Sequence, residues 1–444
     1  MSRFGQNFSA NSSKLRDQCC QSPTLEYNGN MKQITDVHTE IVSNPANAWL
    51  WGDNVIGTPI VLVEDILDRL PIDWSDPTLK FLDPACGRGT FLIAILNRLL
   101  KAGHTHQHIV ENMLFGVDID EKNAAFTRSF LSARGKYRTN IECCDALTKD
   151  WNMKFNVVVG NPPYQDNTEG NGNNIKLWTK FVEKANDLID TGGHVAYVTP
   201  LTWQAPISRV NPVRQVFNDN NLLWVNTDVG HHFDVGSTFS AWIYRKGPRT
   251  TTQTEMNGVL VDITKLLYVP NAEHFSIHNK VVFTNTVGGF DVLGDETANV
   301  ILTKKKPDLL SRVTTETHVY EAFHTNHQSL WSSRPLKNQA DKKVLFTTSG
   351  HVKPVYDAGM KGVSNTSRFI LVSSAHEGSA VASLLWSKLY QFIMETAKWG
   401  GFVNVNVIKA LPKLSTAKIW TDEELYTHFN LTQEEINLIE STVK

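Results

Sequence analysis

The tetrapeptide Asn161-Pro-Pro-Tyr164 has the residue types in this chain that are best suited to chemistry. It follows residues 156–160, a short apolar run typical of a buried strand that ends in a turn. Two prolines remove two backbone donors and fix φ, so this corner is stiff and its carbonyl groups point outward. Ligands bind at the carboxyl ends of strands in an open α/β sheet. An amide, carbonyl groups and an aromatic ring at that place can hold a planar amine and stack on its ring. This describes an extruded nucleobase with an exocyclic amino group.

A second motif, Asp83-Pro-Ala-Cys-Gly-Arg-Gly-Thr90, is a glycine-containing turn between a predicted strand and a predicted helix. Gly87 and Gly89 allow the backbone to approach a ligand closely, and such loops hold nucleotide-like cofactors. The spacings of dinucleotide-binding and phosphate-binding loops are both absent. The acidic residue that opens the turn favours a cofactor with a cationic part. A helix-capping turn without a ligand is the alternative interpretation.

Two further aspartates follow predicted strands. Asp118 ends the second strand, where a carboxylate can accept both hydroxyls of a ribose. Asp145 follows the third strand and can accept a hydrogen bond from an adenine amino group. Either residue can instead cap its own loop, which is a common role of aspartate.

The elements that position these residues alternate along the chain. Helices are predicted at residues 60–70, 91–100 and 177–189, and strands at residues 80–82, 114–117, 141–144, 157–159, 193–198, 223–229 and 239–244. This alternation predicts an α/β fold: a Rossmann-like, mostly parallel seven-stranded sheet with helices on both faces.

The pattern changes after about residue 250. Strand-like runs at residues 259–263 and 281–284, an amphipathic helix at 381–396 and short helices within 425–442 predict a mixed α+β domain. We therefore expect a flexible extension at residues 1–30, a catalytic domain at 31–250 and a recognition domain at 251–444.

Composition limits the possible classes of protein. The 444 residues carry a net charge of −2, so the chain as a whole lacks the positive charge typical of nucleic-acid-binding proteins. Residues 301–370, however, contain eleven Lys/Arg and five Asp/Glu, which predicts either a phosphate-contacting face or an ordinary solvated surface. No transmembrane segment is expected, and five cysteines without a CxxC pair predict a reducing, cytoplasmic setting. The alternate histidines 104, 106 and 108 lack the partners of a metal site, so no metal is expected.

The order of the motifs carries a family resemblance. Thr58-Pro59 at a helix start, the Asp83 loop, Gly-Val-Asp118, Asp145 and Asn-Pro-Pro-Tyr164 follow one another. This order resembles the S-adenosylmethionine-dependent DNA amino-methyltransferases of the gamma motif order, found in restriction–modification systems. The resemblance covers residues 50–250 well and the C-terminal half weakly.

The resemblance implies a cofactor and its contacts. The cofactor would be S-adenosyl-L-methionine, with Thr58 and Pro59 closing over its methionine tail. Asp118 would hold the ribose and Asp145 the adenine. The methionine and sugar side would be lined by Asp83, Ala85, Gly87 and Gly89.

The resemblance also implies catalytic roles. Asn161 and the carbonyl of Pro162 would accept hydrogen bonds from the target amine, and Tyr164 would stack on the flipped base. Phe233 would supply a second aromatic face, with Phe239 as the substitute, and core packing is the alternative for both. Two acceptors on the amine help to free its lone pair for in-line attack on a sulfonium methyl, so no strong base is required.

These residues predict a site-specific adenine-N6 DNA methyltransferase with a C-terminal recognition domain. Cytosine C5 chemistry needs a nucleophilic cysteine. In the family that carries it out this cysteine follows a proline, and no cysteine here does so. Asn in the first position of the tetrapeptide favours adenine, whereas Ser is more frequent in cytosine-N4 enzymes. An RNA or protein-glutamine methyltransferase and a catalytically silent DNA-binding protein remain alternatives.

The expected partners are double-stranded DNA and a separately encoded restriction endonuclease, since no nuclease cluster is evident in the sequence. The polar residues 165–174 are expected to order against DNA, or to form a plain solvent loop.

Overall fold

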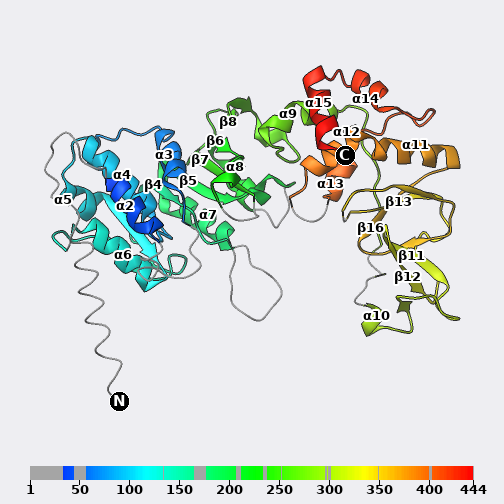
Figure 1. Cartoon of the computed structure of the whole chain (residues 1–444), viewed down its shortest axis with the longest axis horizontal. Coiled ribbons are helices and arrows are strands. Elements are labelled where there is room, and N and C mark those ends of the chain that lie inside the picture. The colour runs from blue at the N-terminus through cyan, green and yellow to red at the C-terminus, as the bar shows by residue number, and fades with distance from the viewer. Residues whose placement is uncertain are drawn as a thin grey trace, which may run out of the picture. The chain divides into compact units, whose positions relative to one another are not determined.

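The computed structural model describes residues 34–44, 57–133, 135–164, 177–206, 212–233, 238–251, 253–295, 298, 302–348, 350–399 and 403–443. The chain forms two compact units (Figure 1). The first comprises Met1–Trp203 and Ser208–Thr264, and the second comprises Gln204–Ile207 and Lys265–Lys444. None of the described helices has the length and apolarity needed to cross a bilayer.

The first unit is built on one large sheet. Its strands are β1 (Phe81–Asp83), β2 (Leu114–Asp118), β3 (Asn140–Cys143), β4 (Phe155–Gly160), β5 (Ile189–Pro200), β6 (Asn221–Asn226), β7 (Phe239–Arg245), β8 (Thr254–Met256) and β9 (Val259–Val261). Their order is β3-β2-β1-β4-β5-β7-β6-β8-β9. The five neighbouring strands β3, β2, β1, β4 and β5 are parallel to one another. Strand β7 runs antiparallel to both β5 and β6. The mostly parallel α/β fold is confirmed, and the β8–β9 hairpin extends the seven expected strands to nine.

Helices cover both faces of this sheet. They are α2 (Ile34–Ser43), α3 (Ile60–Asp68), α4 (Thr90–Lys101), α6 (Glu121–Leu131), α7 (Leu177–Leu188) and α8 (Pro212–Asp219), with a short helix α5 (His106–His108). Alternate residues of β7 show why both faces are apolar. Ala241 and Ile243 pack in the core cluster that contains α3 and α4, whereas Trp242 lies 4.9 Å from the Phe217 ring of α8. Strands buried on two sides are the expected consequence of helices on both faces.

The strand order reverses beside β1. This strand pairs with β2 on one side and with β4 on the other, with Phe81 in register with both Leu114 and Val157. Such a reversal leaves a crevice outside the carboxyl ends of the strands, where ligands bind in open α/β sheets. Asp83 is the last residue of β1, and the tetrapeptide at 161–164 follows the end of the neighbouring strand β4.

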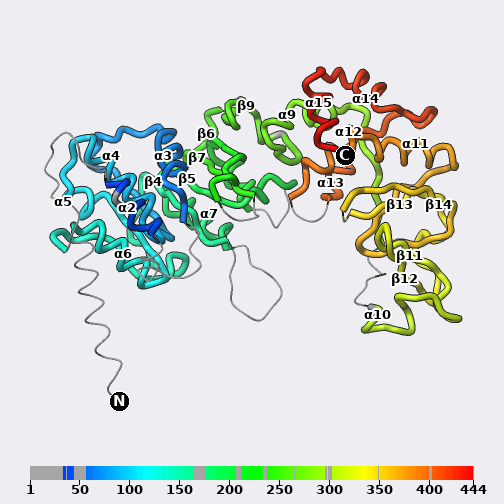
Figure 2. Tube along the Cα trace, viewed as in Figure 1, coloured from blue at the N-terminus to red at the C-terminus, as the bar shows by residue number. Residues whose placement is uncertain are grey.

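The second unit is a mixed α+β domain, as expected. One sheet has the order β10-β12-β11-β15 and another the order β14-β13-β16. Their strands are β10 (Leu310–Ser311), β11 (Tyr320–Thr325), β12 (Gln328–Ser332), β13 (Lys343–Thr347), β14 (Val355–Asp357), β15 (Gly362–Val363) and β16 (Ser367–Leu371). The helices include α10 (Leu302–Lys305), α11 (Ala375–Trp386), α12 (Lys388–Thr396), α13 (Val405–Ala410), α14 (Asp422–His428) and α15 (Gln433–Thr442) (Figure 2).

Two predictions for this unit need correction. The helix expected at residues 381–396 is two helices, because Ser387 leaves the helical conformation (φ −57°, ψ 147°) and caps α12 by accepting from the N–H of Tyr390. The strand-like run at residues 281–284 lies mostly within the π-helical segment Asn279–Phe283, where Val281 and Val282 pack into the core. Short apolar runs do not distinguish strand from buried helix.

Candidate functional site

The turn after β1 is held in a conformation that requires glycine. Gly87 has φ 51° and Gly89 has φ 79°, both in the left-handed region. A Cβ atom on Gly89 would lie 2.8 Å from the Cγ2 atom of Thr127, so no side chain fits there. The Thr127 hydroxyl donates to the carbonyl of Gly87 at 3.0 Å. Gly89 therefore packs closely against Thr127 of α6, and the approach of a ligand to this turn stays a prediction.

Asp118 fixes this turn from the end of β2. Its Oδ2 accepts from the N–H of Gly87 at 2.8 Å, and its Oδ1 accepts from the N–H of Asp120 at 2.9 Å. The Nδ2 of Asn123 also donates to Oδ1 at 3.2 Å. The carboxylate therefore has a single fixed orientation, in a largely buried position at the strand end.

Asp145 lies beside it, after β3. The N–H of Cys144 donates to the carbonyl of Asp118 at 3.1 Å, which draws the ends of β2 and β3 together. The carboxylate of Asp145 accepts from the N–H of Leu147 at 2.9 Å and from the hydroxyl of Thr148 at 3.1 Å. Both oxygens thus hold their own turn, as in the capping interpretation, and the residue is half-buried. Asp83, Asp118 and Asp145 follow or end three adjacent strands.

Asp83 is the most deeply buried of the three. Only 2% of it is exposed, and its Oδ1 accepts from the N–H of Ala85 at 3.1 Å. Burial raises the pKa of this carboxyl to about 8, and the negative charge of Asp118 adds to the increase, while the Ala85 hydrogen bond opposes it. A cation in contact with Asp83 would restore the charged form.

Gly160 connects this carboxylate to the neighbouring strand. It is the last residue of β4, with φ 152°, and a Cβ atom there would lie 2.9 Å from the Oδ1 of Asp83. The absence of a side chain at Gly160 therefore lets Asp83 pack against the backbone that leads directly into Asn161.

The tetrapeptide forms a partly buried corner after β4. The hydroxyl of Tyr164 donates a short hydrogen bond to the Oδ1 of Asn161. Burial holds the pKa of Tyr164 well above its usual value, so the hydroxyl keeps its proton. Asn161 and Tyr164 are half-buried, Pro162 is buried and Pro163 is exposed.

Three aromatic rings continue from this corner. The ring centroid of Tyr164 lies 5.1 Å from that of Phe239, which lies 4.9 Å from that of Phe233. Strand β7 is antiparallel to β5, with Phe239 opposite Pro200, so β7 begins at the edge where the parallel strands end. Both phenylalanines are buried, at 8% exposure for Phe233 and 1% for Phe239. The structure thus brings together the two candidates for the second aromatic face.

The Thr58-Pro59 pair lies at the start of α3. The carbonyl of Pro59 accepts from the N–H groups of Leu62 and Val63 at 3.0 and 3.1 Å, and Thr58 is buried. A Cβ atom on the preceding Gly57 would lie 3.8 Å from a guanidinium nitrogen of Arg88. This distance places the start of α3 against the turn that follows β1.

Two residues at this site had not been expected. His38 of α2 is buried, and its Nε2–H donates to the carbonyl of Arg88 at 2.7 Å; burial lowers its pKa to about 4, so the ring is neutral. Ile119 is 76% exposed, although it lies between Asp118 and Asp120. The position of Ile119 between two aspartates is the only feature of the sequence that could have indicated it. No feature of the sequence around His38 indicates a place at this site.

The three alternate histidines hydrogen-bond to backbone carbonyls. The Nε2 atoms of His104, His106 and His108 bond to the carbonyls of Trp74, Leu131 and Pro77, at 2.9, 2.8 and 2.9 Å. They connect α5 and the residues just before it to two other segments, residues 74–77 and the end of α6. Among the described residues no group of His, Cys, Asp or Glu is arranged to hold a metal ion. The loop prediction for residues 165–174 lies outside the described residues.

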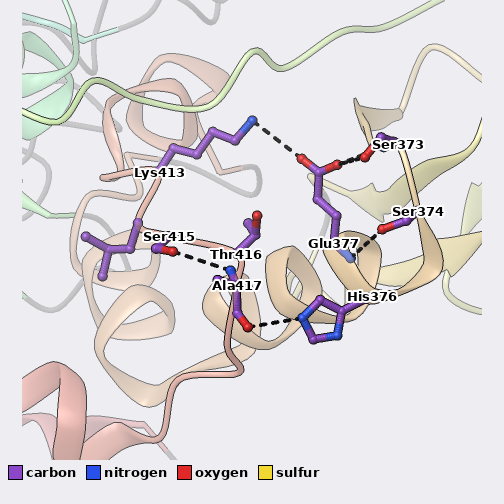
Figure 3. Close-up of a pocket in the computed structure, with 9 residues that line it drawn as sticks. Ser373, Ser374, His376, Glu377, Lys413, Ser415, Thr416 and Ala417 are labelled. Carbon is purple, nitrogen blue, oxygen red and sulfur yellow. Dashed lines mark hydrogen bonds and ion pairs between the residues drawn. The ribbon is translucent and has the colours of Figure 1, made fainter.

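The second unit contains a polar groove of about 590 Å³ beside the start of α11 (Figure 3). Figure 3 shows the ammonium of Lys413 directed at Glu377, 3.8 Å away, and the same carboxylate accepts from the hydroxyl and the N–H of Ser373. The charges in the groove are therefore balanced by one another, which leaves little net attraction for an anion.

Comparison with known proteins gives consistent matches. Residues 107–233 match the Eco57I restriction-modification methylase family. The chain is 25% identical over 189 residues to the type II restriction enzyme and methyltransferase RM.BcgI of Heyndrickxia coagulans, covering 40% of this chain and 29% of that protein. It is 32% identical over 158 residues to the type II methyltransferase M.VspI of Vibrio sp. (strain 343), covering 34% of this chain and 36% of that protein.

One solved structure is similar over most of the chain. It is a nuclease-deletion mutant of the type ISP restriction-modification enzyme LlaGI, with a TM-score of 0.54, 11% identity, and coverage of 88% of this chain and 55% of that chain. At this identity the likeness shows the fold. The matched part of the chain spans 29% and 36% of the length of these two curated relatives. The resemblance to restriction–modification methyltransferases is confirmed by the family and curated matches.

Proposed function

We propose that this chain is a DNA methyltransferase of a restriction–modification system, which transfers a methyl group from S-adenosyl-L-methionine to the N6 amino group of a flipped adenine. The observation that carries the proposal is the position of two motifs at neighbouring strand ends. A buried acidic turn follows β1, and the Asn-Pro-Pro-Tyr corner follows β4, with Gly160 in contact with both. A cofactor in the crevice would therefore lie next to a base held at the corner.

The donor set of the crevice fits this cofactor. Asp83 offers a buried carboxyl group whose pKa is raised by burial and by the charge of Asp118, so a cationic ligand would favour its ionised form. Asp118 and Asp145 offer carboxylates at the next two strand ends. The exposed side chain of Ile119 offers an apolar contact to a flat ring. We assign the methionine and sugar side to the turn after β1, the ribose to Asp118, and the adenine to Asp145 with Ile119.

The residues of the corner would then activate the amine. When bound, the cofactor would supply a methyl group on a positively charged sulfur. Asn161 Oδ1 and the carbonyl of Pro162 accept the two N–H groups of the target amine, which turns its lone pair away from the ring and toward the methyl group. Tyr164 stacks on one face of the base, and we assign the other face to Phe233, because Phe239 packs against the Tyr164 ring itself and is 1% exposed. Positioning and electrostatics provide the acceleration, and stacking offsets the cost of extruding the base, a few kcal/mol.

Methyl transfer to defined polymers tests the proposal. Tritium from labelled cofactor should enter unmethylated DNA and not RNA or a glutamine peptide, and hydrolysis of the DNA should release N6-methyladenine. Label in RNA or peptide alone would refute the DNA assignment. Release of N4-methylcytosine would keep the enzyme class and change the base. Cofactor binding without transfer to genomic DNA would favour a catalytically silent DNA-binding protein.

The second unit has a basic surface that suits the DNA backbone. Leu310 pairs with Ser332, so the residues before β10 and after β12 emerge at the same end of the sheet. We call this the basic end; its residues are Lys304, Lys305, Lys306, Arg334 and Lys337. All five are exposed, and none has an ion pair with another residue that the structure describes, whereas Lys343 and Lys361 are paired with acids at 3.0 and 2.9 Å. Unpaired cations of this kind bind phosphates.

Replacing Lys304, Lys305 and Lys306 with Gln is therefore expected to weaken DNA binding in a salt-dependent manner. The slope of log K against log salt should fall by about 2 to 3, since each lost phosphate contact removes about 0.9. Binding to duplex DNA measured across salt concentrations checks this. The matched control replaces Lys388 and Lys418, which are paired with Glu440 and Glu424. An equal change in slope for both variants would contradict a specific role for the basic end.

A further inference from the structure

The acceptor assigned to the target amine already has a donor. The hydroxyl of Tyr164 donates to the Oδ1 of Asn161. This is the oxygen that accepts the amine in the proposed reaction. Because burial keeps the phenol protonated, the hydroxyl acts as a donor at every pH at which the enzyme would work. The tyrosine O–H and the N–H of a target amine would therefore donate to the same amide oxygen.

The position of the Tyr164 ring is also fixed. Its ring lies at 5.1 Å and 31° from Phe239, which is 1% exposed and contacts Phe233 at 4.9 Å. Phe239 is held by the pairing of β7 with β5, so the surface under Tyr164 is rigid. The prolines between Asn161 and Tyr164 limit the backbone of the corner. Ring and hydroxyl thus have separate contacts, one to Phe239 and one to Asn161.

We propose that the Tyr164 hydroxyl holds the place of the target amino group, and that an extruded base must exchange its own N–H for the tyrosine O–H on Asn161. This inference rests on the proposed function. A base with an exocyclic amine replaces the hydrogen bond that it breaks. A base with an oxygen at that position places two acceptors face to face and replaces nothing, which is unfavourable for a partly buried oxygen. Tyr164 is in this respect a specificity-determining residue as well as a stacking surface.

The variant Tyr164→Phe separates the two roles, because it keeps the ring and removes the hydroxyl. Without the competing donor, kcat/KM on fragments of unmethylated genomic DNA is expected to rise by roughly threefold to tenfold, the worth of one net hydrogen bond. The change should appear mainly in KM. Tyr164→Ala, which also loses stacking, is expected to lower kcat/KM by roughly tenfold or more. Tyr137→Phe is the matched control, since that ring lies beside His106 and Lys136, outside the site. An unchanged or lower kcat/KM for Tyr164→Phe overturns the inference.

A second measurement does not depend on methyl transfer. In the DNA-free full chain with labelled asparagine, the side-chain amide of Asn161 is assigned by its absence in Asn161→Ala. Tyr164→Phe should shift the Asn161 amide resonances and leave those of Asn112 unchanged. If Asn161 does not shift, the hydrogen bond is absent in solution and the inference is wrong. If the wild type transfers no methyl group to DNA, the proposed function fails, and the amide spectrum still decides whether Tyr164 occupies Asn161.

Discussion

Replacing Asn161 with Ala is expected to lower kcat for methyl transfer by about 10²- to 10³-fold, the range seen when one preorganised polar group is removed from an active site. The affinity for S-adenosyl-L-methionine should stay near that of the wild type, because Asn161 lies after β4 and contacts Tyr164, whereas the cofactor turn follows β1. Single-turnover transfer to unmethylated DNA and calorimetric titration of the cofactor measure the two effects separately.

The control for this prediction is Asn112→Ala. Asn112 is exposed, and within the part of the chain that the structure describes its side chain hydrogen-bonds only to His108, at 3.3 Å. Its replacement should leave both transfer and cofactor binding unchanged. A large loss of cofactor affinity in Asn161→Ala would show that the corner and the cofactor turn are not separate in function, and the assigned role of Asn161 would then be wrong.

Cofactor affinity is expected to fall as pH is lowered below about 8. Burial raises the pKa of Asp83 to about 8 in the empty protein, so the carboxyl is mostly protonated at lower pH. A cationic cofactor favours the ionised form, and the proton must be released on binding. Affinity should therefore fall by up to tenfold for each pH unit, or about 50-fold from pH 8, where half of the Asp83 carboxyls are ionised, to pH 6. Calorimetry in buffers of different ionisation enthalpy should show release of nearly one proton at pH 6.

Asp83→Asn isolates this contribution from other titrating groups. The variant should bind the cofactor more weakly at pH 8 and lose most of the dependence on pH. Folding stability depends on the pH in the opposite direction from cofactor affinity. Because the folded-state pKa is raised, protonated Asp83 contributes stability that is fully present below about pH 4 and is lost as pH rises through about 8. A wild-type affinity that is flat between pH 6 and pH 8 would contradict the assignment of Asp83 to a cationic ligand.

The sequence predicts the strand-end residues well, for a local reason. Asp83, Asp118 and Asn161 each follow a short apolar run, and a Gly or Pro next to Asp83 and Asn161 marks where those two strands stop. Parallel strands bring such ends to one edge of a sheet, so a correct strand pattern is enough to place them together. The register of β1 with β2 and β4 bears this out.

Other features depend on contacts far apart in the sequence. Helix α2 is rich in β-branched residues, which have low helix propensity, and its His38 bonds to Arg88 fifty residues away. The β8–β9 hairpin lies after residue 250 and still joins the first sheet, because β8 pairs with β6. The hydrogen bond between Tyr164 and Asn161 likewise needs a side-chain conformation that residue types alone do not specify.

Gly160 has a consequence for protein engineering. Its missing side chain leaves the space that the Asp83 carboxylate fills, so the turn after β1 and the corner after β4 share one packing surface. Grafting either loop alone onto another scaffold would leave a hole or a collision at this point. Designs that borrow this chemistry should transplant the two segments together, with the glycine, as a single cassette.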